Sequence, residues 1–357
     1  MSRRGGNSKS VWWQKIMSSS NREMGTKLSA LVWREFKRNR VAIAGLYVVF
    51  FLLGIALFAD FLANDKPYYL RYQGKSYFPI LRGYMVQLGL ARLPPELLNV
   101  EYKTLDNQAA VFPPIPYRPS NVNLAASFAP PSGKHWLGTD KLGRDVMAGI
   151  IHGSRISLSI GFVAVGISLM IGVMLGALAG FFGGWIDLVT SRLFELMLAI
   201  PTFFLLITIA AVFPPSIFLT MVIIGLTGWV GIARFARNEF LKLRSLDYVT
   251  AALALGVSSR KIMFRHILPN ALAPVMVSVV LGVAGAILLE SGLSFLGIGV
   301  PADTVTWGSI LNEARSNTFA WWLAVFPGVA IFITVLAYYL VGEGLRDALD
   351  PRLRGLR

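Results

Sequence analysis

The chain has 357 residues and no cysteine; 55% of the residues are hydrophobic and only 15% are charged. Soluble domains carry about 25% charged residues, so this composition excludes two soluble domains and indicates a membrane protein with several spans, without disulfides or thiolate metal sites. The net charge of +15 lies mainly in residues 1–40 and 231–266, beside apolar stretches, which favours the positive-inside pattern of membrane proteins over nucleic-acid binding.

The N-terminal part predicts one membrane crossing. Residues 1–40 are expected to be a basic cytoplasmic segment, either an interfacial amphipathic stretch or a partly disordered tail. Residues 41–59 carry no charge and are long enough to span a bilayer, so the first transmembrane helix is expected within residues 41–63. Basic residues precede this helix and Asp60 follows its apolar part, which puts the N-terminus in the cytoplasm.

Residues 64–150 are expected to form an external loop or cap. The segment is rich in proline, and its many tyrosines and phenylalanines indicate a folded structure rather than a disordered linker. Residues 72–78, with Gly74, predict a small hairpin. Two roles remain open for the cap: docking of a protein that delivers substrate, and a lid packed on the membrane domain for stability.

Glycines and charged residues are concentrated near the end of the cap, in residues 135–145. Gly138 and Gly143 permit tight turns, and Asp140, Arg144 and Asp145 can form a local charge network at the membrane face. We interpret this group as structural bracing near the outer mouth. A metal site or a catalytic pair of carboxylates is the alternative.

Residues 151–345 predict the membrane core. Within the uncharged stretch 156–185, small residues at four-residue spacing allow close helix packing. These are Gly172, Gly176 and Gly180. Pro201 predicts a kink in the next span, and the Phe-Pro-Pro-Ser sequence of residues 213–216 predicts an external turn that divides residues 196–230 into two crossings.

A polar stretch, residues 245–270, interrupts the core and predicts two short helices joined by a hinge. Ser245 and Ser258 are the candidate N-caps, and Gly256 suits the left-handed position that ends the first helix. The second helix is expected to end before Pro269. The stretch is too short and too polar to span a bilayer, so we expect a partner to hold it at the membrane surface.

The C-terminal third predicts two further crossings. Glu290 ends the apolar residues 267–289 on the external side, and we interpret this carboxylate as a gate or as a contact for the amino terminus of a cargo. Residues 307–315 predict a short external helix, and residues 319–341 predict the last span. Residues 346–357 would be a cytoplasmic tail, which gives six crossings with both ends inside.

The polar stretch resembles the coupling loop of ATP-binding-cassette (ABC) importer permeases. That family's motif is Glu-Ala-Ala, three residues, Gly, nine residues, Ile-x-Leu-Pro. The matching positions are Ala251, Ala252, Gly256, Leu268 and Pro269. Thr250 stands in place of the Glu, and His266 stands in place of the Ile.

Three other stretches look like one branch of this family, the dipeptide, oligopeptide and nickel permeases of the C-subunit type. Residues 135–145 with 153–158 resemble the signature before the second span, and residues 342–354 resemble the C-terminal signature. The long loop, with residues 112–117, is similar to the subgroup that takes longer or microcin-like peptides. The resemblance covers residues 135–357 well and the first span moderately.

The resemblance implies an all-α membrane protein, with the six transmembrane helices of the type I ABC importer permease fold and a long external loop between helices 1 and 2. A cytoplasmic coupling loop, residues 238–268, would sit in a groove on an ATPase and move as a lever when two ATPases close. The coupling residues would be Asp247, Thr250, Ala251, Ala252, Gly256, Arg260, Leu268 and Pro269.

The implied assembly lies in the inner membrane of a bacterial cell. It contains a second homologous permease subunit, two ATPase subunits, an external peptide-binding protein, membrane lipid and a peptide substrate. This chain has no Gly-x-x-x-x-Gly-Lys-Ser/Thr phosphate loop, so ATP and Mg²⁺ are expected in the ATPase subunits and no cofactor is expected in this chain.

Three alternatives remain. One is a permease of the same family for nickel or another small solute, although the absence of an obvious His- or Met-rich pathway lining favours peptide. A secondary transporter would need ionisable residues at mid-membrane, and the uncharged mid-spans argue against one. A membrane-embedded enzyme would need a convergent catalytic set, for which Asp140, Asp145 and Glu290 at the outer face are the candidates.

Overall fold

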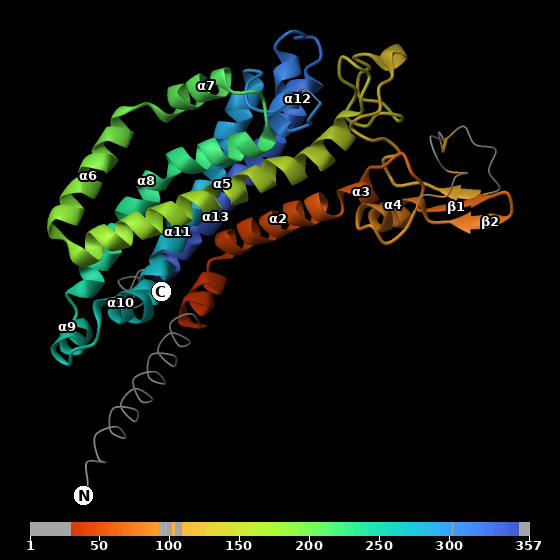
Figure 1. Cartoon of the computed structure of the whole chain (residues 1–357). Helices are drawn as coiled ribbons and strands as arrows, with labels where there is room; N and C mark the ends of the chain where they lie inside the picture. Colours follow the sequence, from red (N-terminus) through yellow and green to blue (C-terminus); the bar gives the residue numbers. More distant parts are fainter. Residues whose placement is uncertain are drawn as a thin grey trace, which may run out of the picture.

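The computed structural model describes residues 30–92, 94, 97, 102–103, 109–301 and 303–349, and it is mainly a bundle of long helices (Figure 1). Within these residues, five helical segments are long and apolar enough to cross a membrane. They are α2 (Arg40–Leu57), α5 (Val146–Phe182), α8 (Ile217–Arg244), the run from α10 through α11 (Ser259–Phe295) and α13 (Trp322–Leu349).

A further pair of helices has the length and hydropathy of a broken sixth crossing or of a re-entrant loop. Helices α6 (Gly184–Ala199) and α7 (Thr202–Val212) are bent by 78° at a break that contains Pro201, because proline cannot donate the backbone hydrogen bond that would continue the helix. Residues 213–216 then form the turn into α8, where Ser216 caps the new helix through the backbone N–H of Leu219. The kink and the turn that the sequence predicts are both confirmed.

The predicted glycine stripe packs α5 directly against α8. A Cβ atom at Gly172 would lie 2.9 Å from the Ile232 side chain, and one at Gly176 would lie 2.4 Å from the Ala233 carbonyl oxygen. Neither helix could approach the other this closely with a larger residue on the stripe. The structure therefore confirms the packing role expected for these glycines.

The bundle has a buried core and an apolar exterior. Leu158, Ile224 and Ile287, from α5, α8 and α11, are each at most 3% exposed and belong to one hydrophobic cluster. On the outside, Phe51 of α2 and Met170 of α5 are 67% and 76% exposed. A helix that is apolar all round is stable only where its outer side faces lipid, so the exterior is that of a membrane domain.

The bundle begins and ends at the same side. Residues 30–38 are helical and precede α2, and Phe36 is buried against Ala42 and Ala348. The start of α2 thus touches the end of α13. The remainder of the predicted N-terminal segment and the tail after Leu349 lie outside the described residues.

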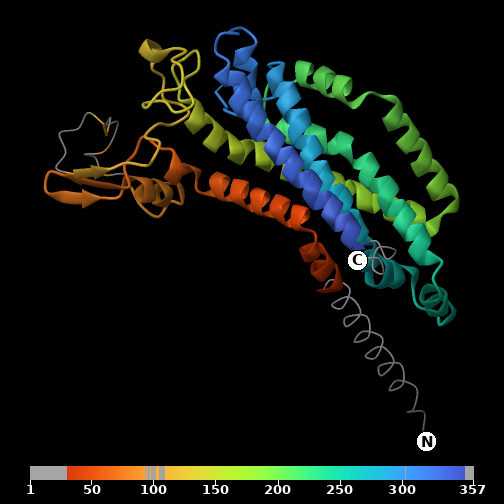
Figure 2. The same ribbon diagram turned by 180° about the vertical axis from the view of Figure 1, so that it is seen from behind.

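The cap departs from the all-α expectation by a small sheet. Strands β1 (Tyr69–Tyr72), β2 (Lys75–Tyr77) and β3 (Ala109–Val111) pair antiparallel in the order β2-β1-β3, so the predicted hairpin is confirmed and gains a third strand. Helix α3 (Ala59–Leu62) leads from α2 into this sheet, α4 (Pro79–Gln87) follows β2, and a short turn of helix, η2 (Leu124–Ala126), follows β3. Figures 1 and 2 both show the cap at the end of α2 that is far from α9.

Two boundaries differ from the sequence expectation. Helix α2 ends at Leu57 and the chain turns into α3, whereas one helix was expected within residues 41–63. Helix α5 starts at Val146, inside the predicted cap, because Asp145 accepts a hydrogen bond from the backbone N–H of Ala148 and caps it.

Candidate functional site

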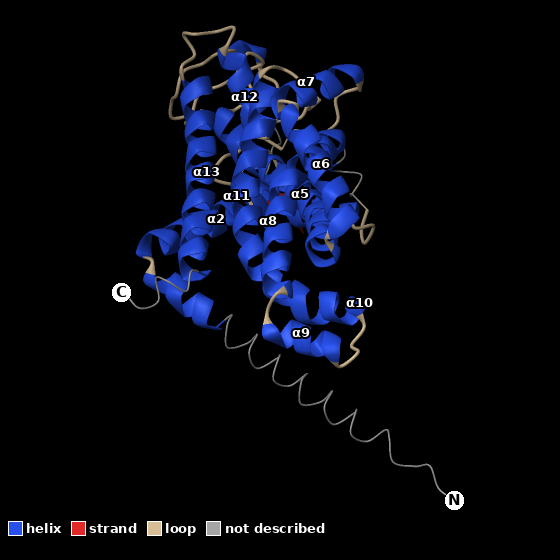
Figure 3. Cartoon of the chain, turned by 90° about the vertical axis from the view of Figure 1, so that its left-hand side faces the viewer, coloured by secondary structure: helices blue, strands red, loops and turns tan. Residues whose placement is uncertain are grey.

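The polar stretch after α8 forms a two-helix knob at the end of the bundle opposite the cap. Helix α9 (Asp247–Ala254) is followed by α10 (Ser259–Ile262), by a π-helical turn, η3 (Met263–Ile267), and by α11 (Leu268–Phe295). Figure 3 shows α9 and α10 projecting beyond the long helices. The hinge between them contains Gly256 with a φ of +74°, the left-handed conformation expected from the sequence.

Apolar side chains fix this knob to the bundle. Val249 and Ile262 are fully buried beside Phe240 of α8, and Ile267 is fully buried where the stretch enters α11. Ala252 belongs to the same cluster and is only 3% exposed, so this predicted coupling residue packs inside the knob rather than on its surface. A rigid knob can transmit a displacement to α8 and α11 because its core is continuous with theirs.

The outer face of the knob offers the other predicted coupling residues. Asp247, Thr250, Ala251, Gly256, Arg260 and Pro269 are exposed, and Leu268 is half-buried. Between them, Leu253 and Leu255 are 44% and 75% exposed. Exposed leucines beside a basic helix form an apolar contact surface with a polar rim, which suits protein docking.

Two local predictions for this stretch are wrong, and a third, the cap at Ser258, is confirmed in position only. Ser245 does not cap α9, because its hydroxyl donates to the Lys242 carbonyl oxygen at 2.9 Å and Leu246 takes the cap position. Ser258 occupies the cap position of α10 but makes no side-chain cap bond. The second helix does not end before Pro269: the helical run continues from α10 through η3 into α11, and Pro269 lies in the first turn of α11.

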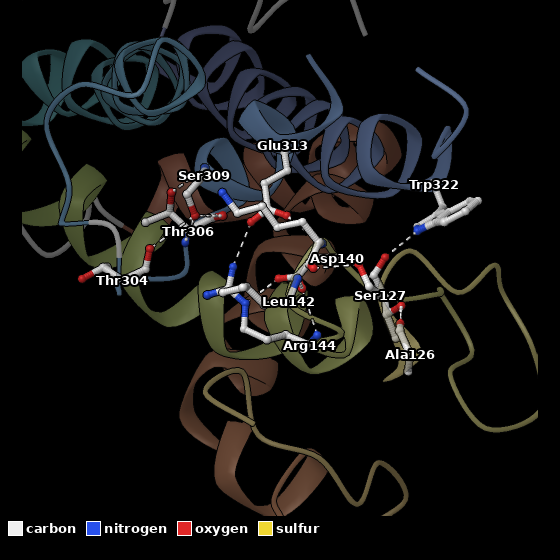
Figure 4. Close-up of polar contacts among 12 residues, drawn as sticks. Ala126, Ser127, Asp140, Leu142, Arg144, Thr304, Thr306, Ser309, Glu313 and Trp322 are labelled. Atoms are coloured by element: carbon white, nitrogen blue, oxygen red, sulfur yellow. Dashed lines mark hydrogen bonds and ion pairs between the residues drawn. The ribbon is translucent and has the colours of Figure 1, made fainter. Parts of the chain in front are cut away.

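The second candidate site is a charge network at the cap end, drawn in Figure 4. Asp140 accepts hydrogen bonds from the backbone N–H groups of Leu142 and Arg144, at 2.8 and 2.9 Å, and its other oxygen pairs with the Arg144 guanidinium. The same guanidinium reaches Glu313 of α12 (Trp307–Ala314), with Nη2 2.8 Å from Oε1. Arg144 thus ties the loop before α5 to the helix before α13.

Glu313 was absent from the sequence prediction. Burial and the neighbouring Asp140 carboxylate raise the pKa of Glu313 above its ordinary value of 4.5, despite the ion pair with Arg144. The only sequence signal was an acidic residue in a short external helix. A cavity of about 250 Å³ opens beside this network and is lined by Arg144 and Glu313.

Asp145 does not join this network, contrary to the sequence prediction. One of its oxygens caps α5, and the other lies 2.8 Å from Nδ1 of His135.

The two glycines of this signature have the conformations expected from the sequence: Gly138 and Gly143 have φ values of +78° and +69°. A Cβ at Gly143 would lie 1.8 Å from the Asn123 carbonyl oxygen, so the turn excludes any side chain there.

Glu290 is enclosed rather than open to a pathway. Its side chain is 0% exposed, and Oε1 accepts a hydrogen bond from Ser294 at 2.7 Å. Its other oxygen lies within 3.5 Å of the hydroxyls of Ser157 and Ser291. The carboxylate therefore joins α5 to α11 in this conformation and touches no open surface. Among the described residues there is no group of three metal-ligating side chains, here or elsewhere.

The chain matches two family models. Residues 172–355 match the model described as "Binding-protein-dependent transport system inner membrane component". Residues 27–95 match the "N-terminal TM domain of oligopeptide transport permease C". The first model covers the broken span, the knob, Glu290 and α13.

Several curated proteins are similar to the chain over most of its length. The inner membrane ABC transporter permease protein YejE of Escherichia coli is 36% identical over 89% of this chain and 96% of its own length. The peptidoglycan transport system permease protein YejE of Agrobacterium fabrum is 34% identical over 90% and 92%. The dipeptide transport system permease protein DppC of Alkalihalophilus pseudofirmus is 42% identical over 63% and 74%.

Among solved structures, the inward-facing MetNI methionine ABC transporter has a chain with a TM-score of 0.45 and 19% identity, covering 57% of this chain and 98% of that one. The family match over the membrane core and the near full-length relatives agree with the bundle and the knob described above. The chain therefore belongs to the inner-membrane components of binding-protein-dependent transport systems, as a permease subunit of an ABC transporter.

Proposed function

We propose that this chain is one of two permease subunits of an ATP-driven importer for peptides and forms half of the translocation pathway. Relatives named for dipeptide and oligopeptide transport support the cargo class, at 42% identity for DppC and 39% for OppC of Bacillus subtilis. Nickel is a weaker alternative, because the described residues contain no group of three metal-ligating side chains that a pathway for that ion would favour.

The observation that carries the coupling mechanism is the rigid knob with an exposed apolar tip. Leu255 and Leu253 would enter a groove on an ATPase subunit, while Ile262 and Ile267 keep the knob fixed to α11. Closure of two ATPases on ATP and Mg²⁺, which those subunits would bind, would push the knob and tilt α8 and α11 together. The pathway would then alternate between outward and inward access.

The proposed orientation follows from charge. Arg234, Arg237, Lys242 and Arg244 lie at the knob end of α8, and basic residues are retained on the cytoplasmic side. The knob and both chain ends would therefore be cytoplasmic, in the inner membrane. The cap would be external, where a peptide-binding protein delivers cargo.

Arginine substitutions at two exposed apolar positions, at opposite ends of the bundle, test the coupling proposal. Leu255 is 75% exposed on the knob and Val122 is 57% exposed near the cap. In Leu255→Arg, we expect the ATPase subunits to be lost from the purified complex and peptide uptake to fall at least about tenfold, because a charge enters a desolvated contact. Val122→Arg should keep the ATPase subunits bound. If Leu255→Arg retains full ATPase binding and uptake, the coupling proposal fails.

A second cargo is a peptide fragment of peptidoglycan. The Agrobacterium relative named for peptidoglycan transport aligns with 90% of this chain, whereas the DppC relative aligns with 63%. Uptake of a labelled oligopeptide and of a labelled muropeptide, each measured with wild type and with Leu255→Arg, distinguishes the two cargoes. If only muropeptide uptake is lost in Leu255→Arg, wall peptides replace plain oligopeptides as the substrate.

A further inference from the structure

Helix α4 of the cap lies beside the end of the first span. The Tyr84 hydroxyl donates to the Asp60 carboxylate at 2.6 Å, and the Tyr84 ring stacks on Phe61 with centroids 6.1 Å apart. Asp60 follows Leu57, the last residue of α2, by only three positions, so it lies close to the end of the first span. The polar interface on each side of a bilayer is about 5–8 Å thick, so α4 lies at the depth of that interface.

The outer face of α4 is apolar. Phe78, Leu81, Met85 and Leu88 recur at spacings of three or four residues and are 51%, 52%, 48% and 72% exposed. The opposite face holds Ile80, which is 4% exposed. A helix on a water-exposed surface shows the reverse pattern, with polar residues outward.

The charged residues within α4 and the segment that follows it are all basic. Residues 78–92 include the exposed Arg82 and Arg92 and contain no aspartate or glutamate. An apolar stripe with arginines at its side is the composition of helices that lie in a membrane interface and contact anionic headgroups.

We propose that α4 is an interfacial helix whose stripe, Phe78, Leu81, Met85 and Leu88, is covered by lipid. The apolar surface of the first span continues into the cap: Leu57 and Phe58 are 69% and 54% exposed, and the Phe58 ring contacts Phe61, which stacks on Tyr84. Lipid that covers the end of α2 therefore meets the stripe without a break. The helix holds the cap against the membrane, whichever cargo the pathway carries.

The chain has no cysteine, so a single introduced cysteine carries a single label. Leu88→Cys and Met85→Cys place an environment-sensitive fluorophore on the stripe. Gln73→Cys is the matched control, because Gln73 is an exposed residue in the hairpin turn between β1 and β2 of the same cap. The labelled chain is assembled with its partner subunits in phosphatidylethanolamine–phosphatidylglycerol vesicles that contain lipids with a doxyl quencher at carbon 5 or carbon 12.

Carbon-5 doxyl lipid is expected to quench the labels at Leu88 and Met85 at least about twofold more than the label at Gln73, and carbon-12 lipid to quench them less, as interfacial depth requires. Quenching at the two stripe positions that equals the Gln73 control would overturn the proposal. A label at Leu88 that is shielded from both doxyl lipid and aqueous iodide would also overturn it, because a protein surface would then cover the stripe.

Discussion

The close contact between α5 and α8 can be tested with one methyl group. Gly176 lies on α5, and a Cβ there would stand 2.4 Å from the Ala233 carbonyl oxygen and 2.8 Å from the Ala236 Cβ. Both distances are below any relaxed contact, and the nearest atom is backbone, so the two helices must separate. Overpacking of this kind costs about 1–3 kcal/mol. We expect Gly176→Ala to lower the thermal unfolding midpoint of the purified complex.

Gly166 is the matched control on the same helix. A Cβ at Gly166 would have no neighbour within 4 Å, so Gly166→Ala adds only the better helix propensity of alanine, which stabilises by about 0.5–1 kcal/mol. The two variants should therefore shift the midpoint in opposite directions when followed by tryptophan fluorescence in detergent. If Gly176→Ala unfolds at the same temperature as Gly166→Ala, the α5–α8 contact is looser than the structure has it.

Three further predictions concern the cap, the hinge and the buried carboxylate. Burial raises the pKa of Asp60, but hydrogen bonds from Tyr84 and Arg155 hold it below 3.8 overall, so the stabilising effect of the ionised carboxylate is full above pH 3.8 and is lost as the pH falls. At pH 7, Asp60→Asn should lower the free energy of unfolding by about 1 kcal/mol. A difference from wild type that persists unchanged below pH 3.8 would contradict this. Gly256→Ala should lower the free energy of unfolding by about 1 kcal/mol, because alanine is strained at a φ of +74°, and should weaken co-purification of the ATPase subunits. Gly256→Asn should have smaller effects, and equal effects of the two substitutions would argue against backbone strain. Glu290→Ala should lower the free energy of unfolding by about 2–4 kcal/mol, because it leaves the Ser294 hydroxyl unpaired beside a void, and Glu290→Gln should lower it clearly less. Identical melting curves for the two variants would refute the hydrogen-bond network around Glu290.

Local chemistry in the sequence determined the spans and their breaks. An uncharged run of about 20 residues has no stable place except a membrane or a core, so the crossings could be predicted without knowing their neighbours. Pro201 bends its span because the defect lies within its own backbone. Gly256 adopts a positive φ for the same local reason, and the stripe through Gly176 marked a close helix contact although its partner, α8, was unknown.

Only the tertiary structure decided which polar groups meet. Arg144 pairs with Glu313, 169 residues further along the chain, and this partner has no local signal. Asp145 was expected beside Asp140, but the fold gives it to His135 and to the start of α5. These pairings depend on how the loops pack over the bundle, which is a property of long-range contacts.

Burial was decided in the same way. Ala252 matches a motif position and was expected at a partner's surface, yet the packing of α9 on α8 encloses it. Glu290 stays a predicted gate or cargo contact, and only the packing of α5 on α11 shows that hydroxyls of Ser157 and Ser294 enclose it in this conformation. A sequence specifies which side chains are able to make a contact, whereas exposure depends on the helices that fold over them, because each buried surface belongs to two segments at once.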